Sequence, residues 1–365
     1  MGPAERAAAF VQDRIDDGTF PGAVWLVAQE DRIVAEGALG HAMVAPGRVE
    51  TSAATLYDLA SLTKPLSAAL LAVLLERDGR LNLDEPLGRC LPAWRARDDR
   101  GRITPVDLLT HRSGLPAWMP LYLDAGPGDR EARIENLRTV PLLNPPGAGV
   151  VYSDPAYILL GFALEAVGGA PLDRMFRERV TGPLGIDDLL YRPGNGLRDR
   201  TAATEVDHGR ERHLAGARAD GYNGWRSGVI RGEVHDQNAW TLGGVAGHAG
   251  LFGTARAVYR LAREFAGMEG GLLTDAERAR FRVSLTPGLQ EERALGFQIA
   301  TTRGCSAGPA LSPASFGHAG FTGTSLWIDP EAGRIFILLT NRVHPRFREI
   351  DMNAVRRGFH EAACP

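Results

Sequence analysis

The sequence, 365 residues long, predicts a mixed α/β protein of the α+β type, whose antiparallel sheet is built from both ends of the chain. Residues 22–40 place two apolar runs around a polar turn at residues 29–32, which is the pattern of a β-hairpin. Residues 325–341 repeat this pattern, with a turn at residues 330–333. The residues between the two hairpins instead contain apolar segments of helical length. We therefore expect helices to flank the sheet.

Three segments carry clear helical patterns. Residues 61–79, SLTKPLSAALLAVLLERDG, are strongly apolar and end at Gly79. Residues 106–114 are shorter and are also closed by a glycine, while residues 156–169 end in two glycines. Because glycine commonly follows the last turn of a helix, each segment has a predicted end.

The distribution of these patterns predicts two structural parts. We expect residues 1–79 and 216–365 to form the α/β sheet domain. Residues 80–215 are helical and rich in loops, and we expect them to form an inserted, mostly helical subdomain. Clefts commonly form where two such parts meet, so we expect the active site between them.

Composition excludes several classes of function. The formal net charge is -3, so no surplus of basic residues exists to neutralise the phosphates of a nucleic acid. The three cysteines, Cys90, Cys305 and Cys364, match neither a disulfide framework nor a zinc site. This cysteine usage indicates unpaired thiols in a reducing compartment. We expect no metal and no organic cofactor.

The sequence shows no pattern of a signal peptide or a membrane span. The first residues, MGPAERAAAFVQDRIDDG, lack an apolar stretch. The most apolar run, residues 66–75, is far shorter than the roughly 20 residues that cross a bilayer. We therefore expect a cytoplasmic protein without a membrane partner.

Lys64 is the only lysine among the 41 lysine and arginine residues of the chain. Arginine can replace lysine where only a positive charge is needed, but arginine stays protonated and lysine can be tuned. We therefore expect that Lys64 serves proton chemistry. A structural salt bridge is the alternative.

Ser61 and Lys64 form an SxxK motif at the start of the first predicted helix. Side chains three positions apart lie on one face of a helix, so these two are neighbours. Pro65 is tolerated only in the first turn, which places Ser61 at the helix N-terminus, where amide groups favour negative charge. A hydroxyl beside an amine at such a position suits a nucleophile of acyl transfer.

Two later segments complete the candidate site. Tyr152, in a Tyr-Ser-Asp segment, can relay protons if a cation lies nearby; a half-buried loop tyrosine is the alternative. His318 begins the segment HAGF, in which Gly320 lets a substrate approach the backbone closely. The amide groups of Ser61 and Phe321 are candidates for an oxyanion hole.

The order of these motifs, SxxK, then YxD, then HxG, resembles the serine β-lactamase-like superfamily. The flanking segments YDLASLTKPL, DLLTHRSGLP, NPPGAGVVYSDPAYILLG and GFTGTSLWIDP extend the resemblance over nearly the whole chain. The superfamily includes class C β-lactamases, penicillin-binding D-Ala-D-Ala peptidases and related carboxylesterases.

The resemblance implies a role for each matching residue. It implies that Ser61 is the nucleophile and that Lys64 and Tyr152 transfer its protons. It also implies an oxyanion hole formed by the amides of Ser61 and Phe321. The substrate-binding positions that it implies are Asp154, His318 and Gly320.

Two residues depart from the β-lactamase pattern. Asp154 stands where asparagine is usual, and its charge would favour the protonated form of Lys64. His318 stands where lysine is usual, and imidazole is mostly neutral at pH 7. Because β-lactams carry a carboxylate that a lysine would hold, both differences favour esters or amides as substrates.

Residues 232–255 resemble a loop found in a branch of the superfamily that includes muropeptide amidases and some penicillin-binding proteins. His235 and Asp236 in this segment are adjacent, so their side chains diverge, and no third metal ligand is evident. We therefore expect structural roles for both. We expect the same for His111 and for His248, with lining of the pocket as the alternative for His248.

The sequence thus predicts a serine hydrolase that cleaves a small ester or amide, including one derived from the cell wall, through an acyl-enzyme on Ser61. A transacylase with the same residues is one alternative, and a muropeptide amidase or D-Ala peptidase is another. A binding protein without turnover is the third. Neither the acyl group nor the oligomeric state follows from the sequence.

Overall fold

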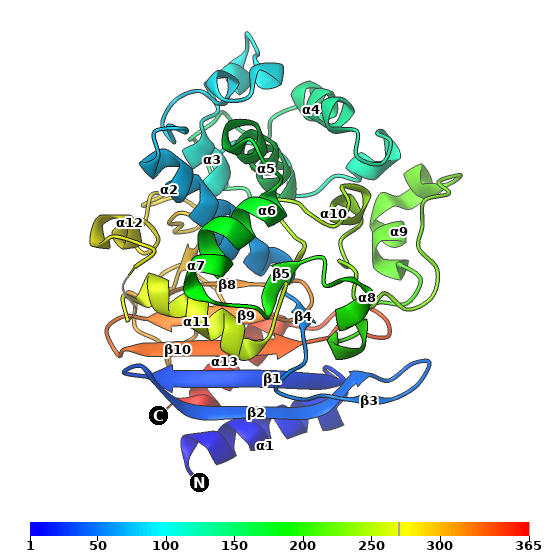
Figure 1. Ribbon diagram of the computed structural model, residues 1–365, viewed down its shortest axis with the longest axis vertical. Helices are drawn as coiled ribbons and strands as arrows, with labels where there is room; N and C mark the ends of the chain where they lie inside the picture. Colours follow the sequence, from blue (N-terminus) through cyan, green and yellow to red (C-terminus); the bar gives the residue numbers. More distant parts are fainter. Residues whose placement is uncertain (269–270, 365) are drawn as a thin grey trace.

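The computed structural model describes residues 1–268 and 271–364, and it confirms the predicted fold class. One seven-stranded antiparallel sheet has the order β3-β2-β1-β10-β9-β8-β7 (Figure 1). Strand β1 of the N-terminal hairpin pairs with β10 of the C-terminal hairpin, with Ala23 opposite Thr340. The strands are β1 Gly22–Gln29, β2 Arg32–Met43, β3 Val49–Glu50, β7 Gln298–Ile299, β8 Phe316–Ala319, β9 Ser325–Asp329 and β10 Arg334–Thr340.

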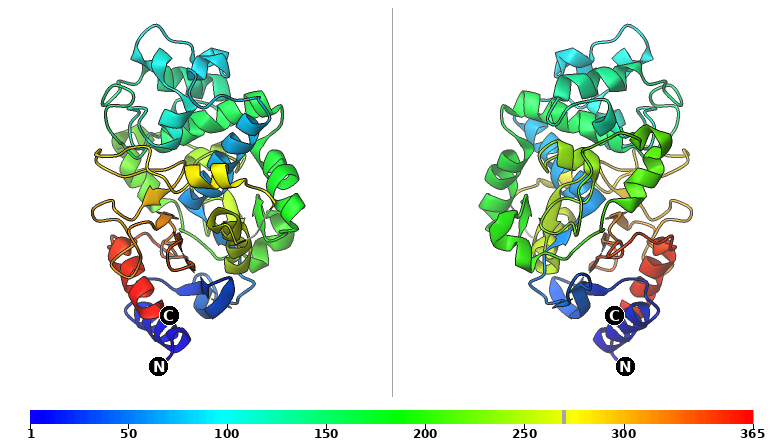
Figure 2. Two further views of the ribbon diagram at one scale, coloured as in Figure 1. Left: turned by 90° about the vertical axis from the view of Figure 1, so that its left-hand side faces the viewer. Right: turned by 90° about the vertical axis from the view of Figure 1, so that its right-hand side faces the viewer.

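Two terminal helices, α1 (Pro3–Asp16) and α13 (Met352–Ala363), pack against each other and cover one face of the sheet (Figure 2). Their apolar faces bury side chains against the sheet residues Trp25 and Trp327. Both chain ends lie together at this face (Figure 2). Helix α11 (Ala255–Ala266) packs against β1 and β10 from the other side.

The remaining helices lie on the same side of the sheet as α11, away from the chain ends (Figure 1). Helix α5 is enclosed by apolar neighbours along most of its length. These helices are α2 Leu70–Arg77, α3 Pro105–Leu109, α4 Arg130–Thr139, α5 Asp154–Gly168, α6 Leu172–Phe176, α7 Gly182–Leu184, α8 Gly194–Leu197, α9 Gly209–Ala215, α10 Gln237–Thr241 and α12 Asp275–Arg280.

The predicted hairpins and the third predicted helix agree with the structure, but the first two predicted helices differ from it. Residues 61–79 form a 3₁₀ turn at Ala60–Leu62, a π-helical stretch at Lys64–Ala69 and only then α2. Proline lacks an amide hydrogen and its ring crowds the preceding turn, which accounts for the break around Pro65. Helix α3 ends before the predicted glycine because His111 adopts a φ of 61°.

A second sheet, which the sequence patterns did not predict, has the order β4-β6-β5. Its strands are β4 Tyr57–Asp58, β6 Leu251–Gly253 and β5 Leu189–Tyr191. Each strand has only two or three residues, and the three come from distant parts of the chain. This sheet fixes the segment that leads into Ser61.

No single helix in the described part of the chain is long and apolar enough to cross a membrane. One pair, α5 with the segment Leu172–Leu184, meets the length and composition criteria only when its two bent halves are taken together.

Candidate active site

Ser61 lies one turn after β4, in a segment held by local hydrogen bonds. The preceding residue, Ala60, has a φ of 46°, which is a strained conformation for a residue other than glycine. The amide of Ala60 donates to Asp58 Oδ1 at 2.8 Å, which stabilises this conformation. Strain retained directly before a reactive side chain is typical of functional sites.

The loop after β8 is fastened to the same segment. Thr322 Oγ1 donates to the carbonyl of Asp58 at 2.7 Å, and Thr324 Oγ1 donates to the carbonyl of Leu59 at 3.1 Å. A Cβ at Gly320 would lie 2.6 Å from the carbonyl oxygen of Leu59, so only glycine fits there. These contacts bring the loop that carries Phe321 up to Ser61.

Lys64 is completely buried and donates hydrogen bonds to three oxygens. Its Nζ lies 2.6 Å from Asp154 Oδ1, 2.9 Å from Ser61 Oγ and 3.3 Å from the carbonyl oxygen of His248. An ammonium group has three donors, so three acceptors fit the charged form. Burial opposes the charge, but the Asp154 carboxylate and the Tyr152 oxygen outweigh it and raise the pKa of Lys64 above 10.5.

The ring of Tyr152 packs between positively charged and imidazole groups. Lys64 Nζ lies 4.9 Å from its centroid, and the Arg293 guanidinium lies 5.3 Å away. The rings of His111 and His318 lie 4.4 and 5.9 Å from it. His111 accepts the amide of Ser153 at 3.0 Å, so it helps to hold this loop.

His318 is a neutral imidazole with one free nitrogen. Its Nδ1 lies 3.0 Å from the carbonyl of Ala319 and therefore carries the proton that it donates there. Its Nε2 has no hydrogen-bond partner among the described residues, although the side chain is only 4% exposed. Burial, together with the charges of Arg293 and Lys64, holds the pKa of His318 well below 6.5.

The opposite wall of the cavity carries a second set of polar groups. His248 Nε2 lies 2.8 Å from Asp236 Oδ1, and His235 Nε2 lies 3.0 Å from Glu205 Oε2. The adjacent residues His235 and Asp236 therefore serve different partners, as their divergence predicts. Within residues 1–268 and 271–364, no group of three or more metal-binding side chains occurs.

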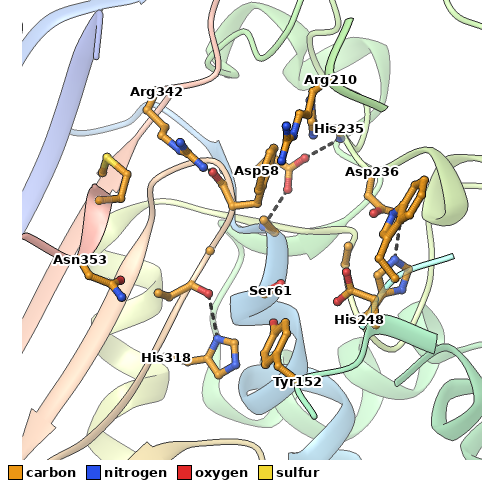
Figure 3. A pocket seen from close by; sticks show the side chains of 18 of the residues that line it. Asp58, Ser61, Tyr152, Arg210, His235, Asp236, His248, His318, Arg342 and Asn353 are labelled. Atoms are coloured by element: carbon orange, nitrogen blue, oxygen red, sulfur yellow. Dashed lines mark hydrogen bonds and ion pairs between the residues drawn. The ribbon is translucent and has the colours of Figure 1, made fainter. Parts of the chain in front are cut away.

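Ser61, Tyr152, His318 and the pair His248 and Asp236 line one cavity of about 450 Å³ (Figure 3). The structure brings together the predicted residues Ser61, Lys64, Tyr152, Asp154, His318, Gly320 and Phe321. The sequence patterns gave no prediction for several further lining residues. They are Asp58, Trp118, Arg210, Glu211, Leu214, Arg293, Arg342, Met352, Asn353 and Arg356. Most of these residues are arginines or carboxylates. The arginines are not marked in the sequence, because all 40 basic residues other than Lys64 are arginine.

Comparisons with known proteins agree with this geometry. The family profile described as Beta-lactamase matches residues 7–359. A protein of Escherichia coli K12 that carries the provisional name D-alanyl-D-alanine carboxypeptidase is 29% identical over 363 residues, with 92% of this chain and 81% of that protein covered.

Solved structures extend the comparison to the whole fold. EstCE1, described as a hydrolase with promiscuous acyltransferase activity, has a TM-score of 0.77 at 23% identity and covers 100% of this chain and 98% of its own. A class C beta-lactamase has a TM-score of 0.76 at 15% identity, and the match covers 98% of this chain and 95% of that protein. At these identities the likeness concerns the fold.

Proposed function

The chain belongs to the beta-lactamase family and is a serine hydrolase, and we propose that Ser61 is the nucleophile that an ester or amide substrate acylates. The observation that carries this proposal is the set of three hydrogen bonds made by Lys64. One of them reaches Ser61 Oγ, and the other two fix the ammonium group in place.

In this mechanism Lys64 stays charged and Tyr152 relays the proton. Because the ammonium group donates to Ser61 Oγ, the hydroxyl proton of Ser61 must point elsewhere. As Ser61 Oγ attacks the carbonyl carbon, its proton passes to the Tyr152 oxygen, and Tyr152 gives its own proton to the leaving group. The bond to the leaving group breaks, and the acyl group remains on Ser61. Water then attacks the ester by the reverse relay.

The amides of Ser61 and Phe321 supply the oxyanion hole. The amide of Phe321 donates no hydrogen bond within the described part of the chain, so it is free to bind a substrate oxygen. Its loop is held by Thr322, Thr324 and the close approach at Gly320. One preorganised donor of this kind contributes about 3 kcal/mol to transition-state stabilisation.

A D-alanyl-D-alanine carboxypeptidase activity is the more specific candidate, because the Escherichia coli relative carries that name. Acyl transfer is the second candidate, since EstCE1 is described as a hydrolase with promiscuous acyltransferase activity. Both reactions start with the same acyl-enzyme. They differ in the acyl donor and in the acceptor that releases the acyl group, so the two are separable by product analysis.

The first experiment is intact mass after exposure to a fluorophosphonate. Wild type should gain one adduct and Ser61→Ala none, while Ser52→Ala, which removes an exposed hydroxyl, should label like wild type. Unlabelled wild type would then be screened for release of D-alanine from a peptide ending in D-Ala-D-Ala, with and without added alcohol or amine. An adduct that persists in Ser61→Ala would refute the assignment of the nucleophile.

A further inference from the structure

Two arginines at one end of the cavity carry positive charge without a carboxylate partner. Arg210 lies in α9, and Arg342 follows β10. Their guanidinium groups lie 4.5 and 5.0 Å from the centroid of the same ring, that of Phe347. Neither forms a salt bridge with any carboxylate in the described residues. Arg293, elsewhere in the same cavity, does pair with Glu291.

The carboxyl groups that line the cavity are committed elsewhere, and two of them, Asp154 and Asp236, pair with Lys64 and His248. Glu211 accepts the amide of Gln237, and burial together with Asp236 raises its pKa well above 4.5, which favours the neutral form. Asp58 accepts the amides of Ala60 and His235 and is buried beneath the loop. The arginine charges therefore remain uncompensated by the protein.

The two arginines also act on each other. Burial and the charge of Arg210 lower the pKa of Arg342 to about 10, which leaves it protonated at neutral pH. Two like charges held over one ring repel, and an anion between them relieves that repulsion. Arginine binds carboxylates through charge-assisted hydrogen bonds, which are stronger than neutral ones.

We propose that Arg210 and Arg342 form a subsite for a carboxylate on the acyl half of the substrate. The inference rests on the proposed function, because it is defined relative to an acyl group on Ser61. In the view of Figure 3, Ser61 lies between the two arginines and the pair Tyr152 and His318. The leaving group takes its proton near Tyr152, so the acyl half extends the other way.

Apolar surface is available for the atoms that join the carbonyl to the carboxylate. The Phe321 side chain is 37% exposed and stacks on Phe347 with centroids 5.3 Å apart. The Arg342 guanidinium lies over the Phe321 ring at 4.9 Å. A short aliphatic chain ending in a carboxylate fits this arrangement, because its carbon atoms can lie on the Phe321 ring while its carboxylate reaches the guanidinium groups.

The test compares two esters that differ only in charge, the p-nitrophenyl monoester of glutaric acid and its methyl-capped neutral analogue. Wild type should favour the anionic ester in kcat/KM, and Arg210→Gln should lower the ratio of anionic to neutral kcat/KM by about 10-fold or more, the loss of one charged hydrogen bond. Arg342→Gln should lower the same ratio. Because Arg342 Nε also donates to the carbonyl of Phe321 at 2.8 Å, the neutral ester reports any damage to the loop.

Arg212→Gln is the matched control. Arg212 lies in the same helix as Arg210, is exposed and lies over Trp225 at 5.2 Å, away from the cavity lining. Its removal changes the net charge equally and should leave the ratio as in wild type. An equal fall in Arg212→Gln would show a general charge effect and overturn the subsite.

Further outcomes of these experiments would overturn the carboxylate subsite or the proposed function. A wild-type ratio near one, or a ratio unchanged in both Arg210→Gln and Arg342→Gln, overturns the proposal. If neither ester is turned over, glutarate should slow fluorophosphonate labelling of wild type more than glutaramide does, and equal slowing contradicts the subsite. Absence of labelling, or ester turnover that survives in Ser61→Ala, instead refutes the proposed function.

Discussion

At one end of the cavity Lys64 and Arg293 each have a carboxylate partner, whereas at the other end Arg210 and Arg342 have none within the described residues. Lys64 pairs with Asp154 at 2.6 Å, and Arg293 pairs with Glu291. Arg210 and Arg342 share only the ring of Phe347. A charge with a carboxylate partner is held in a fixed geometry. An unbalanced charge becomes favourable only when a ligand of opposite sign arrives, so the two ends suit reaction and recognition respectively.

Lys64→Arg should have the largest effect on the reacting end, a loss of at least about 10³-fold in kcat/KM for any ester. The substitution keeps the charge, but a planar guanidinium cannot reproduce the three bonds of a buried ammonium. Steady-state kinetics beside a thermal melt will separate this effect from unfolding. Activity within about 10-fold of wild type would show that the position needs only a positive charge.

Tyr152→Phe should cost about 10² to 10³-fold in kcat, because the ring and its contacts remain while the proton relay is removed. The loss should shrink for an ester whose leaving group needs no proton, such as p-nitrophenol, compared with an alkyl ester. Equal losses on both esters would contradict a role in protonating the leaving group.

Asp154→Asn should move the alkaline limb of the kcat/KM profile to lower pH by about one unit. The Asp154 carboxylate is one of the groups that raise the pKa of Lys64 against burial, so its removal lowers that pKa. Because the mechanism needs the ammonium form, activity is then lost at a lower pH. A profile whose acid limb moves instead, with higher activity at neutral pH, would show that neutral Lys64 is the base.

Glu211→Gln should have the smallest effect, a change of less than about twofold in the preference for an anionic ester. Burial and Asp236 raise the pKa of Glu211 and favour its protonated form, so the amide replaces the carboxyl group without changing the charge. A clear rise in the anionic preference would mean that Glu211 is ionised and partly balances Arg210. The same kinetic ratio used for Arg210→Gln measures this change.

Local patterns predicted those parts of the fold in which neighbouring residues decide the structure. The hairpins at residues 22–40 and 325–341 place apolar runs on both sides of polar turns, and α5 is bounded by the Ser153 cap and Gly169. The sheet β4-β6-β5 could not be found this way. Its strands are too short to show a period, and their pairing joins residues far apart in the chain.

In the site, too, local patterns predicted contacts between neighbouring residues but not contacts between distant ones. Ser61 and Lys64 are three positions apart, and the motif itself predicts their contact. Arg210 and Arg342 are brought together only by the folded chain, and arginine is so frequent here that neither is marked in the sequence. The strain at Ala60 also had no sequence signal, because alanine carries none of the usual preference for a positive φ.

The single lysine of the sequence has a practical consequence for studying this protein. Reagents that acylate amines have only two targets in this sequence, the N-terminal amine and Lys64, and in the folded protein the Lys64 amine is fully buried and bonded. Modification of Lys64 therefore requires the region around Ser61 to open. Peptide mapping of that one amine over time would report the opening rate of the catalytic region, without an introduced label and without a background from other lysines.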